Sequence, residues 1–301
     1  MKTIFWAGDS TVAFNSARTY PQTGIGQAMQ LFVRDGIRIE NRAVNGRSTK
    51  SFMDEGRLDG IESEIGEGDF LFIEFGHNDE KINDPARYTD PEGQFRDNLR
   101  RFIGVARMHD AIPVLITPLE RRKYDCESVE INDDAVFMAG SDTAKNEVVR
   151  TGILKADATE KRMPEDNTAG SNMPKDDTAC SGMPEDDTAG SGMPEDDAAQ
   201  PHIIPTHGAY PDAVRAVARE EQVLLIDLNS SSRELLDRIG PEASKELFLH
   251  VPAGRYTVFP QGHSDNSHLQ HAGAVCFAGM IADALTAAGG QYAELVISRQ
   301  D

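Results

Sequence analysis

The sequence has few of the features that mark membrane, secreted or nucleic-acid-binding proteins. Its three cysteines, Cys126, Cys180 and Cys276, are odd in number and widely spaced, which is typical of reduced thiols rather than of a disulfide framework. No run of apolar residues approaches the roughly 18 needed to span a bilayer, so the sequence predicts no membrane-spanning helix. The apolar run Ile4 to Ala7 is too short for a secretory signal. We therefore expect a cytoplasmic protein.

Basic residues are scarce relative to acidic ones. Lys and Arg number 30 against 50 Asp and Glu, which gives a formal net charge of −20. A surface of this sign repels the phosphates of nucleic acid and of anionic lipids, so neither nucleic acid nor a membrane is an expected partner. Hydrophobic residues make up 39% of the 301 residues, which is sufficient for a buried core in one large domain.

One segment lacks the aromatic and β-branched aliphatic residues that a core requires. Residues 163–200 contain a ten-residue repeat: MPEDNTAGSN, MPKDDTACSG, MPEDDTAGSG and a partial MPEDDAAQPH. Burial of such residues cannot offset the entropy of ordering them, so we expect a low-complexity acidic insertion over 125–204, disordered or loosely ordered, within a single domain spanning 1–301. Calcium binding is an alternative for an Asp-rich repeat. The known β-helix type, however, has a nine-residue period with paired glycines and an aliphatic position, which this repeat lacks.

Outside the insertion, short apolar runs alternate with amphipathic helical patterns. The runs predict buried strands at Ile4 to Ala7, Ile37 to Ala43, Phe70 to Phe75, Ile112 to Ile116 and Val223 to Ile226. Helices are expected near residues 25–33, 95–106, 212–221, 232–239 and 272–287. This alternation implies an α/β fold with a five-stranded parallel sheet and helices on both faces. Ligands bind beyond the carboxyl ends of such strands, so the residues that follow each strand are the candidates for function.

Polar or flexible residues follow three of the predicted strands. Ser10 follows the first strand in GDST, Gly46 the second in AVNGRSTKSF, and Asn78 the third in FGHNDEK. Ser10 supplies a hydroxyl, Gly46 a backbone N–H that no side chain shields, and Asn78 an amide donor. Each also has a simpler explanation, because Gly-Asp-Ser favours turns, asparagine caps helices and glycine turns the chain.

A carboxylate and a histidine lie close together near the C-terminus. The segment GHSDNSHLQHAGA places Asp265 three residues before His268, so a short turn could bring the two side chains into contact. A serine nucleophile needs a base within hydrogen-bonding distance, and a histidine base needs a carboxylate at its other nitrogen. His268 is one of eight histidines and is weak evidence alone. Together with the residues at the strand ends, the pair completes a nucleophile, a base, an orienting acid and oxyanion donors.

The segments GDST, NGRSTKSF, GHNDEK and DNSHLQHAGA occur in the order of the four blocks of the SGNH (GDSL-type) hydrolases. The chain most resembles the rhamnogalacturonan acetylesterase branch, and further similarity in PVLITPLERR, THGAYPDAVRAVA and LIDLN extends over about residues 1–124 and 205–290. The resemblance implies a flavodoxin-like, three-layer α/β/α serine esterase with no metal or organic cofactor. It implies Ser10 as the nucleophile, His268 as the base and Asp265 as its partner. It also implies an oxyanion hole made of the N–H groups of Ser10 and Gly46 and the side chain of Asn78.

This resemblance points to removal of O-acetyl groups from carbohydrate, above all pectic rhamnogalacturonan oligosaccharides, through an acyl-enzyme on Ser10. A lipase or thioesterase of the same superfamily and a noncatalytic glycan-binding protein of the same fold are the alternatives. The sequence contains no Gly-x-Ser-x-Gly elbow, which argues against an α/β-hydrolase, and no His-Glu-x-x-His zinc motif. An acidic protein is an unexpected host for uronate-containing substrates, but a local basic rim could follow the strands, formed by Arg42, Arg47, Lys50, Arg121, Arg122 and Lys123. A cluster of solvated charges is the more common explanation for such residues.

Overall fold

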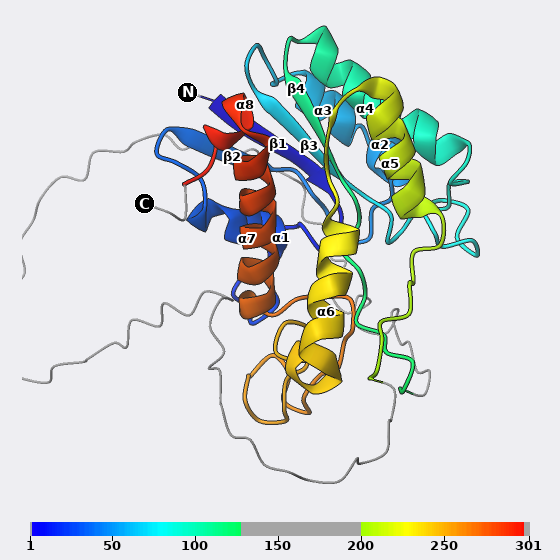
Figure 1. Ribbon diagram of the computed structural model, residues 1–301, viewed down its shortest axis with the longest axis vertical. Coiled ribbons are helices and arrows are strands. Elements are labelled where there is room, and N and C mark those ends of the chain that lie inside the picture. The colour runs from blue at the N-terminus through cyan, green and yellow to red at the C-terminus, as the bar shows by residue number, and fades with distance from the viewer. Residues whose placement is uncertain (1, 128–199, 298–301) are drawn as a thin grey trace, which may run out of the picture. The chain divides into compact units, whose positions relative to one another are not determined.

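Five parallel strands form the central sheet (Figure 1). The computed structural model describes residues 2–127 and 200–297, which belong to one compact unit. The strands are β1 (Lys2–Gly8), β2 (Ile37–Asn41), β3 (Phe70–Glu74), β4 (Ile112–Ile116) and β5 (Leu224–Ile226). Their order in the sheet is β2-β1-β3-β4-β5, and every neighbouring pair is parallel. The predicted α/β class and five-stranded parallel sheet are confirmed.

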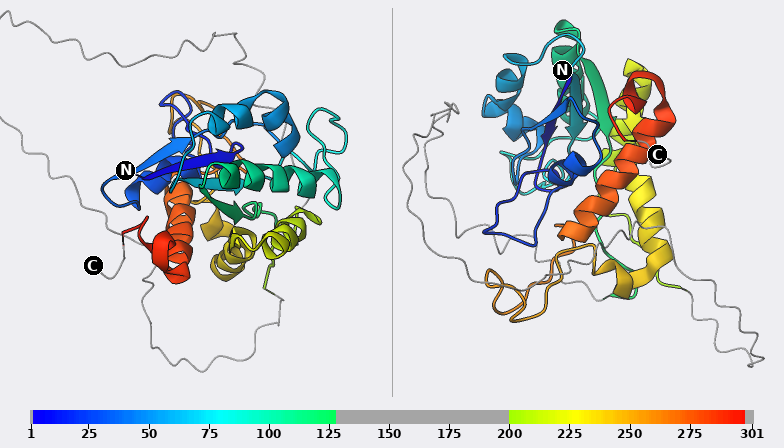
Figure 2. Two further views of the ribbon diagram at one scale, coloured as in Figure 1. Left: turned by 90° about the horizontal axis from the view of Figure 1, so that it is seen from above. Right: turned by 90° about the vertical axis from the view of Figure 1, so that its left-hand side faces the viewer.

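Helices pack on both faces of the sheet and give the predicted three layers. One face is covered by α2 (Thr49–Asp54), α3 (Arg57–Glu62), α4 (Gln94–Met108) and α5 (Tyr210–Glu221). The other is covered by α1 (Ile25–Ala28), α6 (Leu228–Ser244) and α7 (His271–Ala288), and the short α8 (Gly290–Ala293) follows α7. The right-hand view in Figure 2 shows α6 and α7 on the opposite side of the strands from α2 and α3.

The composition of β1 follows from its position between these layers. Ile4 and Trp6 belong to the hydrophobic cluster on the α7 side, whereas Phe5 and Ala7 belong to the cluster on the α4 side. Side chains alternate across a strand, so a strand covered on both faces needs apolar residues at every position. All four side chains are at most 1% exposed, which explains the unbroken apolar run at the start of the chain.

Several predicted boundaries differ from the structure. The second strand ends at Asn41 rather than Ala43, because the Asn41 side chain donates to the Val12 carbonyl and accepts from the Ala43 N–H. The third strand ends one residue early, at Glu74. The helix expected over 25–33 is split into α1 and a 3-10 turn at Met29–Leu31.

The two sides of the predicted insertion meet in the fold. Tyr124 pairs with Ile203 in an antiparallel bridge, and the Asp125 N–H donates to the His202 carbonyl at 3.0 Å. The chain therefore leaves and re-enters the described unit at adjacent points. The repeats at 163–200 lie, apart from Gln200, outside the described residues, as does Cys180. Of the other two cysteines, Cys126 is exposed and Cys276 is buried.

In the described parts of the chain, α7 alone is long and apolar enough to cross a membrane by length and composition. The lack of a long uninterrupted apolar run in the sequence predicts no such helix. Half of α7 is buried inside the fold, and its apolar side chains belong to the core cluster. Its packing is close at Gly273, where a Cβ atom would lie 1.9 Å from the Leu247 carbonyl oxygen. A position in the core therefore accounts for the apolar composition of α7.

Candidate active site

Ser10 lies directly after β1, at the carboxyl edge of the sheet. The pairing of β1 with β3 ends at Gly8, and the Asp9 carbonyl then accepts the N–H groups of Val12 and Ala13 at 3.3 and 3.0 Å. These bonds turn the chain immediately after the strand. Ser10 is partly exposed within this turn, whereas Asp9 and Thr11 on either side are buried.

Asn78 connects the loops that follow β1, β2 and β3. Its Nδ2 donates to the Arg47 carbonyl at 3.2 Å and, through a longer bond of 3.4 Å, to Asp9 Oδ2. Arg47 directly follows Gly46, whose φ of +76° lies in the left-handed region that favours glycine. Asp9 directly precedes Ser10. The Asn78 amide therefore contacts the neighbours of the other two oxyanion candidates.

Arg87 lies beside two of the oxyanion candidates, and no sequence motif marks it. Its Nη1 donates to Asn78 Oδ1 at 3.3 Å, and a Cβ on Gly46 would lie 4.0 Å from the same nitrogen. An ion pair of 2.6 Å between Nε and Asp84 holds the guanidinium in place. A cation at the amide oxygen determines which way the amide nitrogen points. Arg87 therefore orients Asn78.

Asp265 and His268 are in direct contact, as the spacing predicts. His268 Nδ1 lies 2.6 Å from Asp265 Oδ2, and Asp265 Oδ1 accepts the N–H groups of Ser267 and His268 at 2.7 and 2.9 Å. Burial alone would raise the pKa of Asp265, but the hydrogen bonds from His263 and His268 outweigh it and hold that pKa well below its ordinary value. The ionised carboxylate accepts the proton of His268 Nδ1, which leaves Nε2 as the basic nitrogen. Its use as a catalytic base remains a prediction.

The segment around His268 is joined to the loop that follows Ser10. The Thr23 N–H donates to the Leu269 carbonyl at 3.1 Å. Burial raises the pKa of Asp9, and hydrogen bonds from Thr11 and the nearby charge of His268 oppose that rise. The structure thus brings the turn of Ser10 and the Asp265–His268 pair to the same edge of the sheet. Direct contact between Ser10 and His268 Nε2 remains a prediction.

Asp9 and Glu74 are buried carboxylates that support the turn after β1. Asp9 Oδ1 accepts the N–H and the hydroxyl of Thr11, each at 3.0 Å, and the same hydroxyl lies 3.0 Å from Glu74 Oε2. Burial raises the pKa of Glu74 well above its ordinary value, and the neighbouring charge of Asp9 raises it further. These contacts indicate that Asp9 stabilises the turn, which agrees with the prediction that Asp265 rather than Asp9 is the acid partner of His268.

Arg121 fastens the loop after β3 to the turn that carries His268. Its Nη1 pairs with Glu80 Oε1 at 2.5 Å, and its Nε donates to Ser267 Oγ at 3.1 Å. Burial would raise the pKa of Glu80, but the hydrogen bond from His207 and the charge of Arg121 lower it overall. The buried ion pair therefore stays charged and links two segments of the candidate site.

Most of the cations considered for a basic rim form ion pairs with glutamates. Arg42, Arg47, Arg121 and Arg122 pair with Glu64, Glu55, Glu80 and Glu127, respectively. Lys50 donates to the Pro85 carbonyl at 2.5 Å. Four of the six cations are therefore ion-paired with glutamates of the described residues, and a basic rim formed by all six side chains is not supported.

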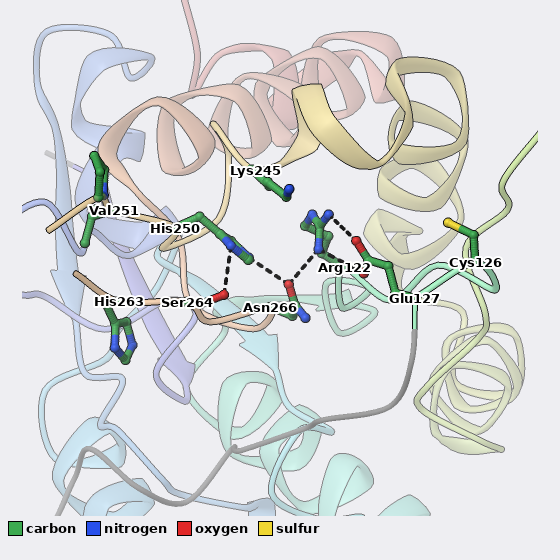
Figure 3. Close-up of a pocket in the computed structure, with 10 residues that line it drawn as sticks. Arg122, Cys126, Glu127, Lys245, His250, Val251, His263, Ser264 and Asn266 are labelled. Atoms are coloured by element: carbon green, nitrogen blue, oxygen red, sulfur yellow. Dashed lines mark hydrogen bonds and ion pairs between the residues drawn. The ribbon is translucent and has the colours of Figure 1, made fainter. Parts of the chain in front are cut away.

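A cleft of about 620 Å³ opens beside the turn of Asp265 (Figure 3). Its lining includes Ser264 and Asn266, which flank Asp265 in the sequence, and His263, whose Nε2 lies 3.7 Å from Asp265 Oδ2.

Within residues 2–127 and 200–297, no group of three or more His, Cys, Asp or Glu side chains could hold a metal ion.

A partly exposed serine after β1, a glycine and an asparagine on the next two loops and an Asp-His pair before α7 are the features that the resemblance to the SGNH class of ester hydrolases predicts. The model of the family described as GDSL-like Lipase/Acylhydrolase matches residues 4–161, which is more than half of the chain. The protein belongs to this family and is a carboxylic ester hydrolase by class. The resemblance inferred from the four sequence blocks is confirmed.

Curated relatives agree with this assignment, and a solved structure shares the fold. The chain is 28% identical over 297 residues to "Rhamnogalacturonan acetylesterase RhgT" of Bacillus subtilis (strain 168), covering 99% of this chain and 95% of that protein. It is 42% identical over 130 residues to "Probable rhamnogalacturonan acetylesterase YesY" of the same organism, covering 43% of this chain and 59% of that protein. The crystal structure of YxiM from Bacillus subtilis matches 96% of this chain and 57% of its own, with a TM-score of 0.59 and 20% identity, which shows a shared fold.

Proposed function

We propose that the protein is a carbohydrate O-acetylesterase that acts on pectic rhamnogalacturonan oligosaccharides through an acyl-enzyme on Ser10. The observation that carries this proposal is the 2.6 Å contact between His268 Nδ1 and Asp265 Oδ2 at the edge of the sheet where Ser10 is accessible. An imidazole oriented by a carboxylate beside a serine is the arrangement used for acyl transfer. Similarity to a rhamnogalacturonan acetylesterase over nearly the whole chain supports the acetyl and carbohydrate specificity.

In the proposed reaction, Ser10 Oγ attacks the ester carbonyl carbon while His268 Nε2 takes the hydroxyl proton. Asp265 stabilises the imidazolium that forms. The developing oxyanion accepts hydrogen bonds from the N–H groups of Ser10 and Gly46 and from Asn78 Nδ2. The 3.4 Å bond from Asn78 to Asp9 is the weaker of its two donor contacts, so it is the one that the oxyanion would replace.

The second half of the reaction uses the same groups. The imidazolium gives its proton to the departing sugar hydroxyl, which leaves an acetyl group on Ser10. Water then attacks the carbonyl carbon of this ester while His268 Nε2 takes a proton from the water. Acetate departs as that proton is transferred to Ser10 Oγ. Both half-reactions place negative charge on the same carbonyl oxygen, so one set of donors serves both.

Acetate release by the wild-type protein and by Ser10→Ala tests the proposal. Acetylated rhamnogalacturonan, acetylated xylan, acetylated monosaccharides and a p-nitrophenyl ester series from acetyl to octanoyl form the substrate panel. We expect the wild type to prefer acetylated rhamnogalacturonan and short acyl chains, and Ser10→Ala to lose at least a thousandfold in kcat. Equal rates in the two proteins would remove Ser10 as the nucleophile. A preference for octanoyl esters would favour a lipase, and glycan binding without acetate release would favour a noncatalytic protein.

A further inference from the structure

His250 forms hydrogen bonds to the residues on both sides of Asp265 (Figure 3). Its Nε2 lies 2.8 Å from Asn266 Oδ1, and its Nδ1 lies 3.0 Å from Ser264 Oγ. A single imidazole therefore spans the turn that carries the candidate acid. His250 belongs to none of the sequence motifs, and it lies outside the Asp-x-x-His segment.

Arg122 determines which nitrogen of His250 carries the proton. Its Nη1 donates to Asn266 Oδ1 at 2.9 Å, and a guanidinium has no acceptor, so this oxygen must accept. His250 Nε2 must then donate to the same oxygen, which leaves Nδ1 to accept from the Ser264 hydroxyl. Burial lowers the pKa of His250, which favours the neutral form that this pattern uses.

The backbone that carries His250 is held on both sides. The segment 248–251 is bridged antiparallel to 263–269 at Phe248 with Leu269 and at Val251 with His263. His250 lies between these two bridges, so its ring has little freedom to move relative to the turn. Asp265 itself bonds to Ser267 and His268 within the turn and lies 3.7 Å from His263, whereas the residues on either side of it, Ser264 and Asn266, both bond to His250.

We propose that His250 is a positioning residue for ester hydrolysis: by holding Ser264 and Asn266, it keeps Asp265 in register with His268 Nδ1. This inference rests on the proposed function. The short contact between Asp265 and His268 must survive the formation of an imidazolium in each half-reaction. Displacement of catalytic groups by about 1 Å can cost on the order of 100-fold in rate, so a rigid support of the acid affects turnover directly.

Three substitutions at His250 test its two hydrogen bonds one at a time and together. His250→Gln keeps a donor for Asn266, His250→Asn keeps an acceptor for Ser264, and His250→Phe keeps a ring but loses both bonds. With p-nitrophenyl acetate, we expect His250→Phe to lower kcat about 10- to 100-fold with little change in KM, and the other two variants to fall between it and the wild type. The downfield proton NMR signal of His268 Nδ1–H should shift or broaden in the same order.

Two further variants provide a gentler perturbation and a control. Ser264 is exposed, so Ser264→Ala removes one of the two bonds with little risk to folding and should lower kcat severalfold. His109 directly follows α4 and precedes β4, at the opposite edge of the sheet. His109→Gln is therefore a matched histidine control, for which we expect wild-type kcat.

Each outcome decides for or against the positioning role. A kcat within twofold of wild type in His250→Phe and Ser264→Ala, or a His268 signal unchanged while only thermal stability falls, would make His250 a structural residue and overturn the inference. Failure of the proposed function would show separately, as equal rates in wild type and Ser10→Ala. The NMR signal reports on the Asp265–His268 contact even in that case.

Discussion

At the scale of single residues, the charge of Asp265 determines which nitrogen of His268 is basic. Asp265→Asn keeps the size of the side chain but removes the charge, and its amide can donate as well as accept, so the His268 tautomer is no longer specified. We expect kcat to fall about 10³- to 10⁴-fold with little change in KM. Acetate release at neutral pH measures the effect. Asp59→Asn, at an exposed position of α3, should keep wild-type activity, and a loss of less than tenfold in Asp265→Asn would contradict the assigned role.

Arg87 acts at the same scale through the Asn78 amide. Arg87→Met removes the 3.3 Å bond to Asn78 Oδ1, so Nδ2 is no longer directed toward the position of the oxyanion. We expect kcat to fall about tenfold, less than the 100- to 1000-fold typical of removing an oxyanion donor outright, as Asn78→Ala should show. Rates with p-nitrophenyl acetate measure both. Arg100→Met on α4, which breaks ion pairs to Asp97 and Glu220 away from these groups, is the matched control.

The site residues that the sequence predicts and those that it misses differ in the sequence separation between each residue and the residue that it contacts. Asp265 and His268 are three residues apart, so the turn between them brings the side chains together and the pattern is visible in the sequence. Arg121 reaches Ser267 from 146 residues away, and His250 reaches Asn266 from 16 residues away. Such contacts depend on the packing of distant loops, which no local pattern encodes.

At the scale of secondary-structure elements, two helical glycines should respond to alanine with opposite signs. A Cβ at Gly273 in α7 would lie 1.9 Å from a backbone oxygen of Leu247, whereas a Cβ at Gly104 in α4 would meet nothing within 4 Å. We expect Gly273→Ala to lower the free energy of unfolding by about 1–3 kcal/mol or more. Gly104→Ala should raise it by about 0.5–1 kcal/mol. Urea denaturation measures both, and equal effects would contradict the close packing of α7.

Asp79 connects α2 to the loop after β3 and makes stability depend on pH. Its Oδ1 accepts the hydroxyls of Thr49 and Thr89 at 2.5 and 2.8 Å, and burial raises its pKa to about 7. Between about pH 4 and pH 7 the folded protein therefore holds a proton that the unfolded chain releases, so this group's contribution to stability falls as pH rises through that window.

Asp79→Asn removes this titration. We expect the free energy of unfolding of the wild type to decrease relative to that of the variant between pH 5 and pH 8. Over this range the folded wild type releases the proton of Asp79, and the variant has no such proton. Urea denaturation at the two pH values gives the difference. Parallel pH dependence in the two proteins would show that Asp79 does not titrate in this range.

The elements that sequence patterns located well are those with strong apolar periodicity. The strand Ile112–Ile116 has the predicted bounds, and α4 extends the predicted helix 95–106 by one residue before it and two after it. The patterns missed α2 and α3, which have six residues each and so present little periodicity. The early end of β2 was not predictable either, since it results from the Asn41 side chain binding a carbonyl 29 residues away.

At the scale of the whole molecule, the residues on the two sides of the segment 128–199 bond directly to each other. The bridge between Tyr124 and Ile203 and the bond between Asp125 and His202 lie within the described unit. We expect a variant with a short Gly/Ser linker in place of 128–199 to fold and to hydrolyse p-nitrophenyl acetate within about threefold of the wild-type rate, because every candidate site residue is retained. Circular dichroism and steady-state kinetics test this. Loss of activity in a folded variant would assign the segment a part in the site.

The distance in sequence between the two halves of the site has a consequence for the protein during its synthesis. Ser10 leaves the ribosome with the first strand, but His268 and the α7 side chains that cover one face of the sheet emerge only near the end of translation. A nascent or truncated chain thus contains the proposed nucleophile without its proposed base, beside an uncovered apolar face that favours aggregation. Hydrolytic activity in this protein would therefore report that the chain has been completed and folded.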